Sequence, residues 1–111
     1  MKNALAKKKC IPCEGGVAPL SPKEAKIYIP HVKGWKLDAK GKEISRTFTF
    51  KNFVKAMAFV SAVAKIAEKE NHHPDIHIFY NKVTLDLSTH AIKGLSENDF
   101  ILAAKVDGII L

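Results

Sequence analysis

One long segment of helical periodicity, closed by a proline, constrains the fold of this chain more than any other feature. We expect the helix to begin at Asn52 and to end near Asn71, because Pro74 disfavours helical geometry at the preceding residue. Apolar residues recur at helical spacing and predict one buried stripe: Phe53, Met57, Val60, Ala64 and Ala67. Small side chains would let the helix lie close to a sheet: Ala56, Ala58, Ala62 and Ala64. At 111 residues, the chain has room for one domain with a single modest core.

Capping signals predict a shorter helix toward each end of the chain. Ser21 and Glu24 fit a capping box around a proline at the first helical position, and Pro30 ends this helix. Ser96 opens the last helix, with Asp99 at the third position of a second capping box. We expect this last helix to run to the C-terminus.

Alternating apolar and polar residues predict two β-hairpins, one on each side of the long helix. Residues 35–37 and 43–50 form the first hairpin, and residues 76–80 and 83–87 form the second. Asn81-Lys82 is a plausible two-residue turn in the second hairpin, since Asn tolerates a positive φ. The predicted order is α-β-β-α-β-β-α, an α+β fold in which a four-stranded antiparallel sheet carries three helices on one face.

The register of the second hairpin brings three histidines toward one place. With this turn, the paired residues are apolar and share a face: Tyr80 with Val83, Ile78 with Leu85, and Ile76 with Leu87. Extending the same pairing puts His73 opposite His90, with His72 and Thr89 close by. The mouth of the hairpin is therefore expected to form a concave corner that holds all three imidazoles, where ligand sites are often found.

The histidine cluster suggests acid–base chemistry, because an unperturbed imidazole titrates near neutral pH. Each histidine also has a structural explanation: at the end of a helix, an imidazole can lie near the last carbonyl groups and interact favourably with the helix dipole. Asp99 fits a helix cap better than a catalytic base, and His77 facing Asp86 looks like an ordinary cross-strand pair. Three imidazoles could hold zinc, but no carboxylate has metal-ligand spacing here, so we rank a metal below proton chemistry.

Composition narrows the class of protein. Hydrophobic residues make up 47% of the chain, which indicates a globular protein, and no apolar run could cross a bilayer or serve as a secretory signal. We therefore expect a cytoplasmic protein without a membrane partner. The net charge of +7 invites nucleic-acid binding, but the lysines are dispersed and Arg46 is the only arginine. The sequence argues against nucleic acid as a partner.

Residues 1–20 are expected to be a flexible lead-in, and residues 21–111 the folded domain, because the first segment lacks periodicity. Cys10 and Cys13 form a CxxC pattern in the lead-in. No second pair of ligands in the chain completes a structural zinc site. Two reduced thiols are the preferred interpretation, and a metal shared between subunits is the alternative.

Seven positions at these spacings resemble the signature of pterin-4a-carbinolamine dehydratases: Glu68, His72, His73, Pro74, Tyr80, His90 and Asp99. The resemblance covers about residues 20–107 and also includes Gly34-Trp35, Phe53, the run 87–90 and Gly94-Leu95-Ser96. It implies the α+β order given above and a homodimer or homotetramer.

The resemblance also implies the reaction, which is loss of water from a 4a-hydroxytetrahydropterin to give quinonoid dihydropterin. The implied catalytic residues are His72, His73 and His90, with His72 and His90 as the acid–base pair and His73 chiefly a binding residue. The residues that would line the pterin site are the three histidines, Asn71, Ser88 and Thr89. Glu68 and Asp99 would stand behind them, with Glu68 orienting His72. No metal or organic cofactor is implied, because the substrate carries the reactive group.

Two other functions stay open at the level of sequence. Animal members of this family also serve as dimerisation partners of a transcription factor, so the fold can act as an interaction module without catalysis. A basic nucleic-acid-binding domain would instead show binding that weakens steeply with salt. The side-chain preference for the pterin and the purpose of the CxxC pattern do not follow from the sequence.

Overall fold

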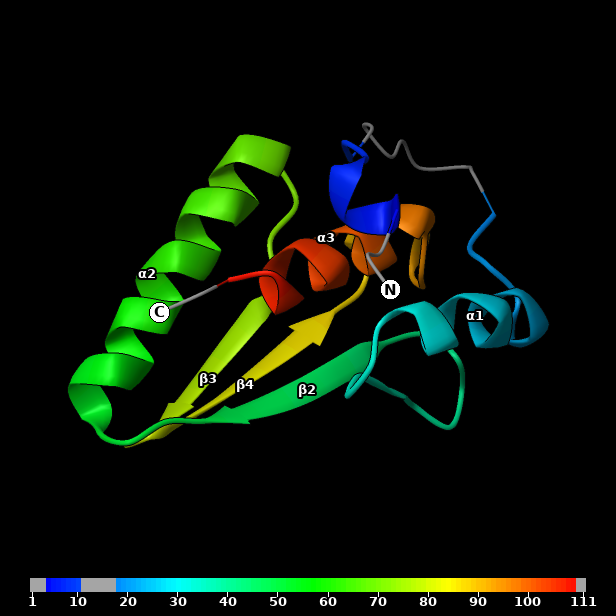
Figure 1. Cartoon of the computed structure of the whole chain (residues 1–111). Helices are drawn as coiled ribbons and strands as arrows, with labels where there is room; N and C mark the ends of the chain where they lie inside the picture. The colour runs from blue at the N-terminus through cyan, green and yellow to red at the C-terminus, as the bar shows by residue number, and fades with distance from the viewer. Residues whose placement is uncertain (1–3, 11–17, 110–111) are drawn as a thin grey trace.

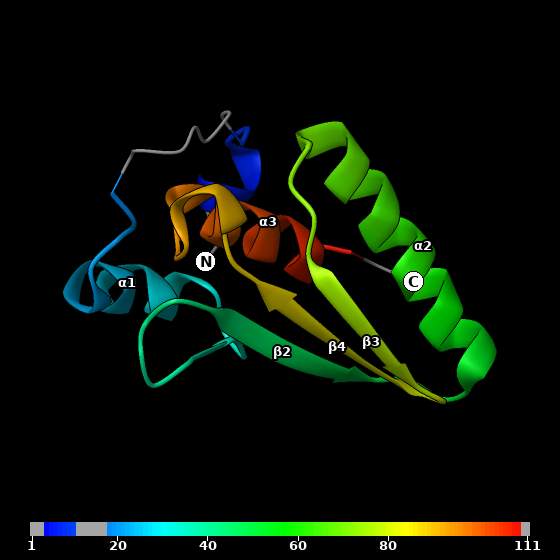
Figure 2. The same cartoon turned by 180° about the vertical axis from the view of Figure 1, so that it is seen from behind.

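A computed structural model describes residues 4–10 and 18–109 of the chain. Figure 1 shows an antiparallel sheet with α2 and α3 lying over one of its faces, and Figure 2 shows the same arrangement from behind. The four strands lie in the order β1-β2-β4-β3. The elements are η1 (Ala4–Lys7), α1 (Pro22–Tyr28), η2 (Ile29–His31), β1 (Lys36–Leu37), β2 (Ile44–Thr49), α2 (Phe53–Glu70), β3 (Asp75–Phe79), β4 (Lys82–Leu87), η3 (His90–Ile92) and α3 (Glu97–Asp107). The α+β fold and the predicted order of helices and strands are confirmed.

The ends of the helices follow the predicted local signals. The Ser21 hydroxyl accepts a hydrogen bond from the Glu24 N–H at 3.1 Å, and Glu24 Oε1 accepts one from the Ser21 N–H at 2.8 Å, which completes the first capping box. The Asn52 side chain accepts the Lys55 N–H at 2.9 Å and starts α2. Asn71, with φ 52, ends α2 in the left-handed conformation. The predicted bounds of both helices are therefore confirmed to within a few residues.

The buried stripe of α2 differs from the predicted one. The residues of α2 that face the core are Ala56, Phe59, Val63 and Ala67. Of the predicted stripe only Ala67 is buried, and Phe53 is 47% exposed. Phe59 decides the rotation of the helix, because its ring packs 4.6 Å from Phe48 and 5.0 Å from Phe50 on the strand side. Among the predicted small residues, only Ala56 is buried.

The second hairpin is shifted by two residues from the predicted register. Ile76 pairs with Leu85, and Phe79 with Lys82, so Tyr80 and Asn81 form the turn. Asn81 is held beside the end of β2, where its side-chain amide donates to the Phe50 carbonyl at 2.9 Å and its own carbonyl accepts the Phe50 N–H at 2.8 Å. A shift of two preserves the faces of both strands, so the predicted apolar face is correct although its pairing is wrong.

The last helix, α3, is largely buried in the core. Nearly every residue from 98 to 106 on α3 is buried, and the helix lies between α2 and α1 over the sheet (Figure 1). It ends at Asp107 instead of continuing to the C-terminus, and residues 110–111 lie outside the described part. None of the helices in the described residues is both long and apolar enough to cross a membrane.

The described part of the predicted lead-in, residues 4–10, packs against α3. Leu5 is buried in the core, and the Lys105 ammonium donates to the Ala6 carbonyl at 2.8 Å. Cys13 lies outside the described residues. The division of the chain at residue 20 stays a prediction, but residues 4–10 contribute to the core and to the pocket described next.

Candidate active site

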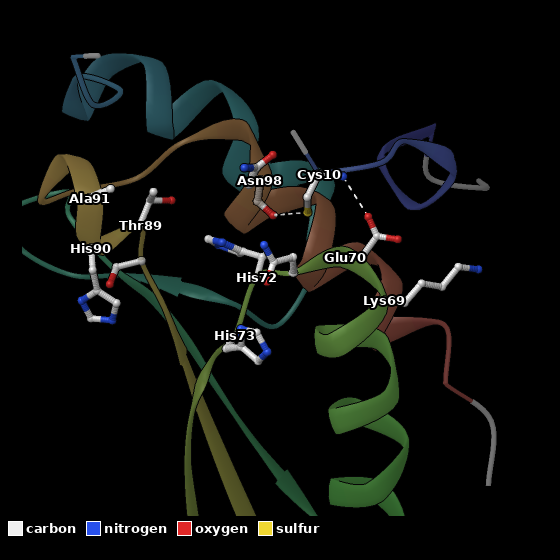
Figure 3. Close-up of a pocket in the computed structure, with 11 residues that line it drawn as sticks. Cys10, Lys69, Glu70, His72, His73, Thr89, His90, Ala91 and Asn98 are labelled. Carbon is white, nitrogen blue, oxygen red and sulfur yellow. Dashed lines mark hydrogen bonds between the residues drawn. The ribbon is translucent and has the colours of Figure 1, made fainter. Parts of the chain in front are cut away.

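A pocket of about 540 Å³ opens between the end of α2, the segment leaving β4 and the start of α3. Figure 3 shows His72 and His73 near the end of α2, with His90 on the other side, next to Ala91 and Thr89. The residues that line it are Cys10, Lys69, Glu70, Asn71, His72, His73, Ser88, Thr89, His90, Ala91 and Asn98. The structure thus brings every residue predicted to be catalytic or substrate-binding to one cavity. Their roles stay predictions.

Two local features deliver the histidines to this pocket. The left-handed turn at Asn71 ends α2, and Pro74 then starts the extended path into β3, so His72 and His73 fall at the corner between them. On the other strand, the chain leaves β4 and makes an isolated bridge between Thr89 and Gly94 that encloses η3. His90 begins η3 and does not pair with His73. The predicted strand pairing was wrong at this point, and the turn of η3 brings His90 to the pocket instead.

His72 is bound to a buried carboxylate. Its Nε2 lies 2.6 Å from Asp99 Oδ1, and the side chains are 12% and 0% exposed respectively. The second oxygen of Asp99 accepts the Thr89 hydroxyl at 2.8 Å and the Ser96 N–H at 2.9 Å. Asp99 therefore caps α3, as predicted, and fixes the orientation of one imidazole in the pocket.

His73 is bound to an exposed carboxylate. Its Nε2 lies 2.6 Å from Glu68 Oε2, with side chains that are 52% and 78% exposed. The prediction that Glu68 orients His72 is therefore not what the structure shows. The spacing from Glu68 to His72 would be one helical turn, but the helix has already ended at Asn71, and this places His73 against Glu68.

His90 is the third imidazole and has an exposed side chain. Within residues 4–10 and 18–109, no protein group hydrogen-bonds to its ring. Both ring nitrogens of His90 are thus available to a ligand, whereas His72 and His73 each have one nitrogen held by a carboxylate. In the described part of the chain, no three His, Cys, Asp or Glu side chains are grouped so that they could hold a metal ion. The arrangement suits proton transfer to and from a bound molecule.

The sequence did not predict the wall that the N-terminal segment adds to this pocket. The Cys10 N–H donates to Glu70 Oε1 at 2.8 Å, and the Cys10 thiol lies 3.6 Å from the Asn98 carbonyl oxygen (Figure 3). Glu70 also lies 3.8 Å from the Lys105 ammonium, with its side chain almost completely buried. Sequence periodicity carries no signal for contacts between residues sixty or more positions apart, so these wall residues could not have been found from their spacing.

Comparisons with known proteins agree on one family. The family sequence model described as pterin 4 alpha carbinolamine dehydratase matches residues 18–109. A protein of Nitrosomonas eutropha, named as a candidate pterin-4-alpha-carbinolamine dehydratase, is 52% identical over 108 residues, which are 96% of this chain and 94% of that protein.

Solved structures support the same relationship. A transcriptional coactivator/pterin dehydratase from Brucella melitensis matches with a TM-score of 0.76 and 34% identity, over 80% of this chain and 95% of that one. A pterin dehydratase-like protein, identified as a RuBisCO assembly factor in the alpha-carboxysome, matches with a TM-score of 0.58 and 25% identity, over 67% of this chain and 86% of its own. Because the family match spans the sheet, the helices and both histidine segments, the chain belongs to the pterin 4 alpha carbinolamine dehydratase family.

Proposed function

We propose that this protein removes water from a 4a-hydroxytetrahydropterin by histidine acid–base catalysis and releases quinonoid dihydropterin. The observation that carries the proposal is the meeting of three imidazoles, from two separate segments, in one pocket of a chain of this family. At about 540 Å³, the pocket also falls within the range of roughly 300–1,000 Å³ that is usual for small-molecule sites.

The reaction needs one proton donor and one proton acceptor. An imidazolium gives its proton to the 4a-hydroxyl as the C4a–O bond breaks, so the leaving group is water and not hydroxide. The electron pair on N5 forms the C4a=N5 double bond, and a second, neutral imidazole takes the proton from N5. The two imidazoles have then exchanged their protonation states, and exchange with solvent restores them before the next turnover.

The surroundings of the histidines suggest a role for each. His72 is the proposed acid, since the buried Asp99 carboxylate can compensate a positive charge on its ring. His90 is the proposed base, because no described protein group occupies its ring nitrogens. His73, braced by Glu68, binds the flat pterin ring. The hydrogen-bonding edge of the pterin would meet Asn71 and Ser88 at the pocket wall.

A stopped-flow assay of a freshly generated 4a-hydroxytetrahydropterin tests this proposal. The intact protein should dehydrate it much faster than buffer, and His72→Ala and His90→Ala should each lower kcat by about 10²- to 10⁴-fold, as expected for general acid–base groups. His73→Ala should mainly raise KM. His77→Ala is the matched control, because its imidazole also binds a carboxylate but lies outside the pocket. A rate equal to that of buffer with the intact protein would refute the proposal.

The second candidate is a binding module without catalysis. It is favoured by the similarity to a pterin dehydratase-like protein that is a RuBisCO assembly factor, and to one described as a transcriptional coactivator. Under this alternative, all three histidine variants would keep the function of the protein. The use of tetrahydrobiopterin in particular, the cytoplasmic location and the homodimer or homotetramer stay predictions.

A further inference from the structure

Glu70, the last residue of α2, joins three parts of the chain that are far apart in the sequence. Its Oε1 accepts the Cys10 N–H at 2.8 Å, and its Oε2 lies 3.8 Å from the Lys105 ammonium on α3. The same ammonium donates to the Ala6 carbonyl at 2.8 Å. The Glu70 side chain is only 5% exposed, although it also lines the histidine pocket. A buried carboxylate is costly unless it is paired, so these contacts hold it in one place.

The N-terminal segment, residues 4–10, is fixed on α3 independently of Glu70. Leu5 is buried in the core. At the other end of the segment, the Cys10 thiol lies 3.6 Å from the Asn98 carbonyl oxygen, as Figure 3 shows. Glu70 therefore bonds to a segment that is anchored at both of its ends.

The last turn of α2 connects Glu70 to His72 through a rigid stretch of backbone. Asn71 has the left-handed conformation, and the N–H groups of Asn71 and His72 both bond back to the Ala67 carbonyl. The backbone from Glu70 to His72 therefore moves with the end of the helix. Two side chains tie this end to α3: His72 through Asp99, and Glu70 through its ion pair.

These two ties behave differently in the proposed reaction. When His72 gives its proton to the leaving group, its ring loses the positive charge, and the electrostatic attraction to Asp99 becomes weaker. Glu70 takes no part in the proton exchange, so its contacts with Cys10 and Lys105 stay the same. The end of α2 is thus still held at the moment when the other tie is weakest.

We propose that Glu70 is a positioning residue, which keeps the His72 imidazole in place throughout turnover by fixing the last turn of α2 to residues 4–10. The proposal rests on the proposed function for the role of His72 as the acid. It gives the N-terminal segment a part in catalysis, through the hydrogen bond between the Cys10 N–H and Glu70.

The first test compares Glu70→Ala with Glu70→Gln in the dehydration assay. Alanine removes both oxygens, whereas glutamine keeps an amide oxygen that can accept the Cys10 N–H and loses only the charge. We expect kcat to fall about tenfold in Glu70→Ala with KM within about twofold, because a misplaced proton donor affects the transition state more than binding. Glutamine should restore most of kcat. A higher KM with unchanged kcat would overturn the proposal.

A double-mutant cycle tests the hydrogen bond itself. Cys10→Pro removes the N–H donor from the other side of the bond, because proline has no backbone N–H. This variant should lower kcat about as much as Glu70→Ala, and the combined variant should be no slower than either one, since both changes break the same bond. Losses that multiply in the combined variant would overturn the role of this bond.

Glu97→Ala is the matched control. Glu97 is a carboxylate of α3 that also holds the N-terminal segment, since it lies 3.0 Å from the Lys8 ammonium, but it does not line the histidine pocket. We expect kcat to be unchanged in this variant. All variants are assayed well below their thermal unfolding midpoints, so that a loss of stability does not lower kcat. A loss in Glu97→Ala equal to that in Glu70→Ala would overturn the specific role of Glu70.

Nitrogen-15 NMR of the histidine rings distinguishes failure of this proposal from failure of the proposed function, because it needs no turnover. In Glu70→Ala the ring signals of His72 should shift, while those of His77, which pairs with Asp86 outside the pocket, should stay. Such a shift in a protein without dehydratase activity would refute the enzyme and support the positioning role. Unchanged His72 signals would overturn the positioning role whatever the catalytic result.

Discussion

Two imidazole–carboxylate pairs lie beside the same pocket. Their nitrogen–oxygen distances are equal, but one pair is buried and the other is exposed to solvent. His72 to Asp99 and His73 to Glu68 both measure 2.6 Å. The Asp99 side chain is completely buried and accepts two further hydrogen bonds, whereas the Glu68 side chain is exposed to solvent. Water screens the exposed pair, so it contributes about 0–1 kcal/mol. The buried carboxylate cannot be replaced by solvent if it is lost, so its other partners would be left without an acceptor.

The comparison shows that distance alone does not rank these residues. A carboxylate that also caps a helix and holds a threonine is fixed by the fold, and it can fix an imidazole in turn. One that stands on the surface of a helix can only bias the position of its partner. Substitutions of the carboxylates should therefore separate the two pairs sharply.

The largest effect is expected for Asp99→Asn. An amide offers one acceptor and two donors, so at least one of the three groups now held by Asp99 would face an N–H. We expect kcat to fall by about 10²-fold or more, because the orientation of His72 is lost. The free energy of unfolding in urea should fall by about 1–3 kcal/mol, because buried donors lose their acceptor. Full activity and full stability in this variant would show that the burial of the pair has no consequence.

Asp107, a third carboxylate of intermediate burial, serves as the control and also allows a test of how stability depends on pH. Asp107, at the other end of α3, lies 2.8 Å from Arg46 and accepts the Trp35 indole N–H at 2.9 Å, with its side chain 23% exposed. Burial raises the pKa of Asp107 above 3.8, although the Trp35 hydrogen bond and the Arg46 charge oppose the shift. The folded protein therefore binds this proton more tightly than the unfolded chain does.

The sign of the pH dependence follows from that shift. The contribution of Asp107 to stability is fully present below pH 3.8 and declines as the pH rises through the higher pKa of the folded state. Asn at this position does not titrate. The stability of the wild type relative to Asp107→Asn, measured by urea unfolding at a series of pH values, should decrease over this window and then level off. An increase with pH would contradict the effect of burial. Activity should stay near that of the wild type.

Glu68→Gln tests the exposed pair and should have a smaller effect. The glutamine can still accept a hydrogen bond from His73, and solvent can replace what it loses. We expect kcat/KM to change by less than about fivefold and stability by less than about 0.5 kcal/mol. A loss as large as that of Asp99→Asn would mean that Glu68 takes a direct part in the reaction.

The smallest effect is expected for His77→Gln. His77 Nε2 lies 2.7 Å from Asp86 Oδ2 on the sheet face away from α2 and α3, and both lie outside the histidine pocket. We expect unchanged kcat and a stability change within about 0.5 kcal/mol, measured with the same two assays. Any clear loss of activity would show that an exposed imidazole–carboxylate pair outside the pocket affects catalysis. It would contradict the inference that burial of a pair determines its effect on activity.

Local signals in the sequence predicted the element order, the caps and the segments that meet at the site. Asn52, Pro74 and Ser96 act on their own neighbours, so their effects can be read without the rest of the fold. The meeting of His72, His73 and His90 was predicted because both segments leave the same hairpin. The roles assigned to them rest on the resemblance and stay untested.

What escaped prediction depends on contacts between distant parts of the chain. Asn81 takes the turn position that its bonds to Phe50 impose, which moved the register by two residues. Phe59 rotates α2 toward the aromatic residues of the first hairpin, so the chosen stripe was wrong. The pairing of Glu68 with His73 instead of His72 follows from the exact place where α2 ends. None of these contacts has a signature in residue spacing.

The packing of residues 4–10 on α3 has a practical consequence for anyone who handles this protein. Cys10 and its bond to Glu70 form part of the wall of the histidine pocket, so an affinity tag or fusion partner attached ahead of Met1 would join the chain within ten residues of that wall. Purification tags are better placed after Leu111, and a protease used to trim the amino terminus should be checked for cleavage within the first ten positions.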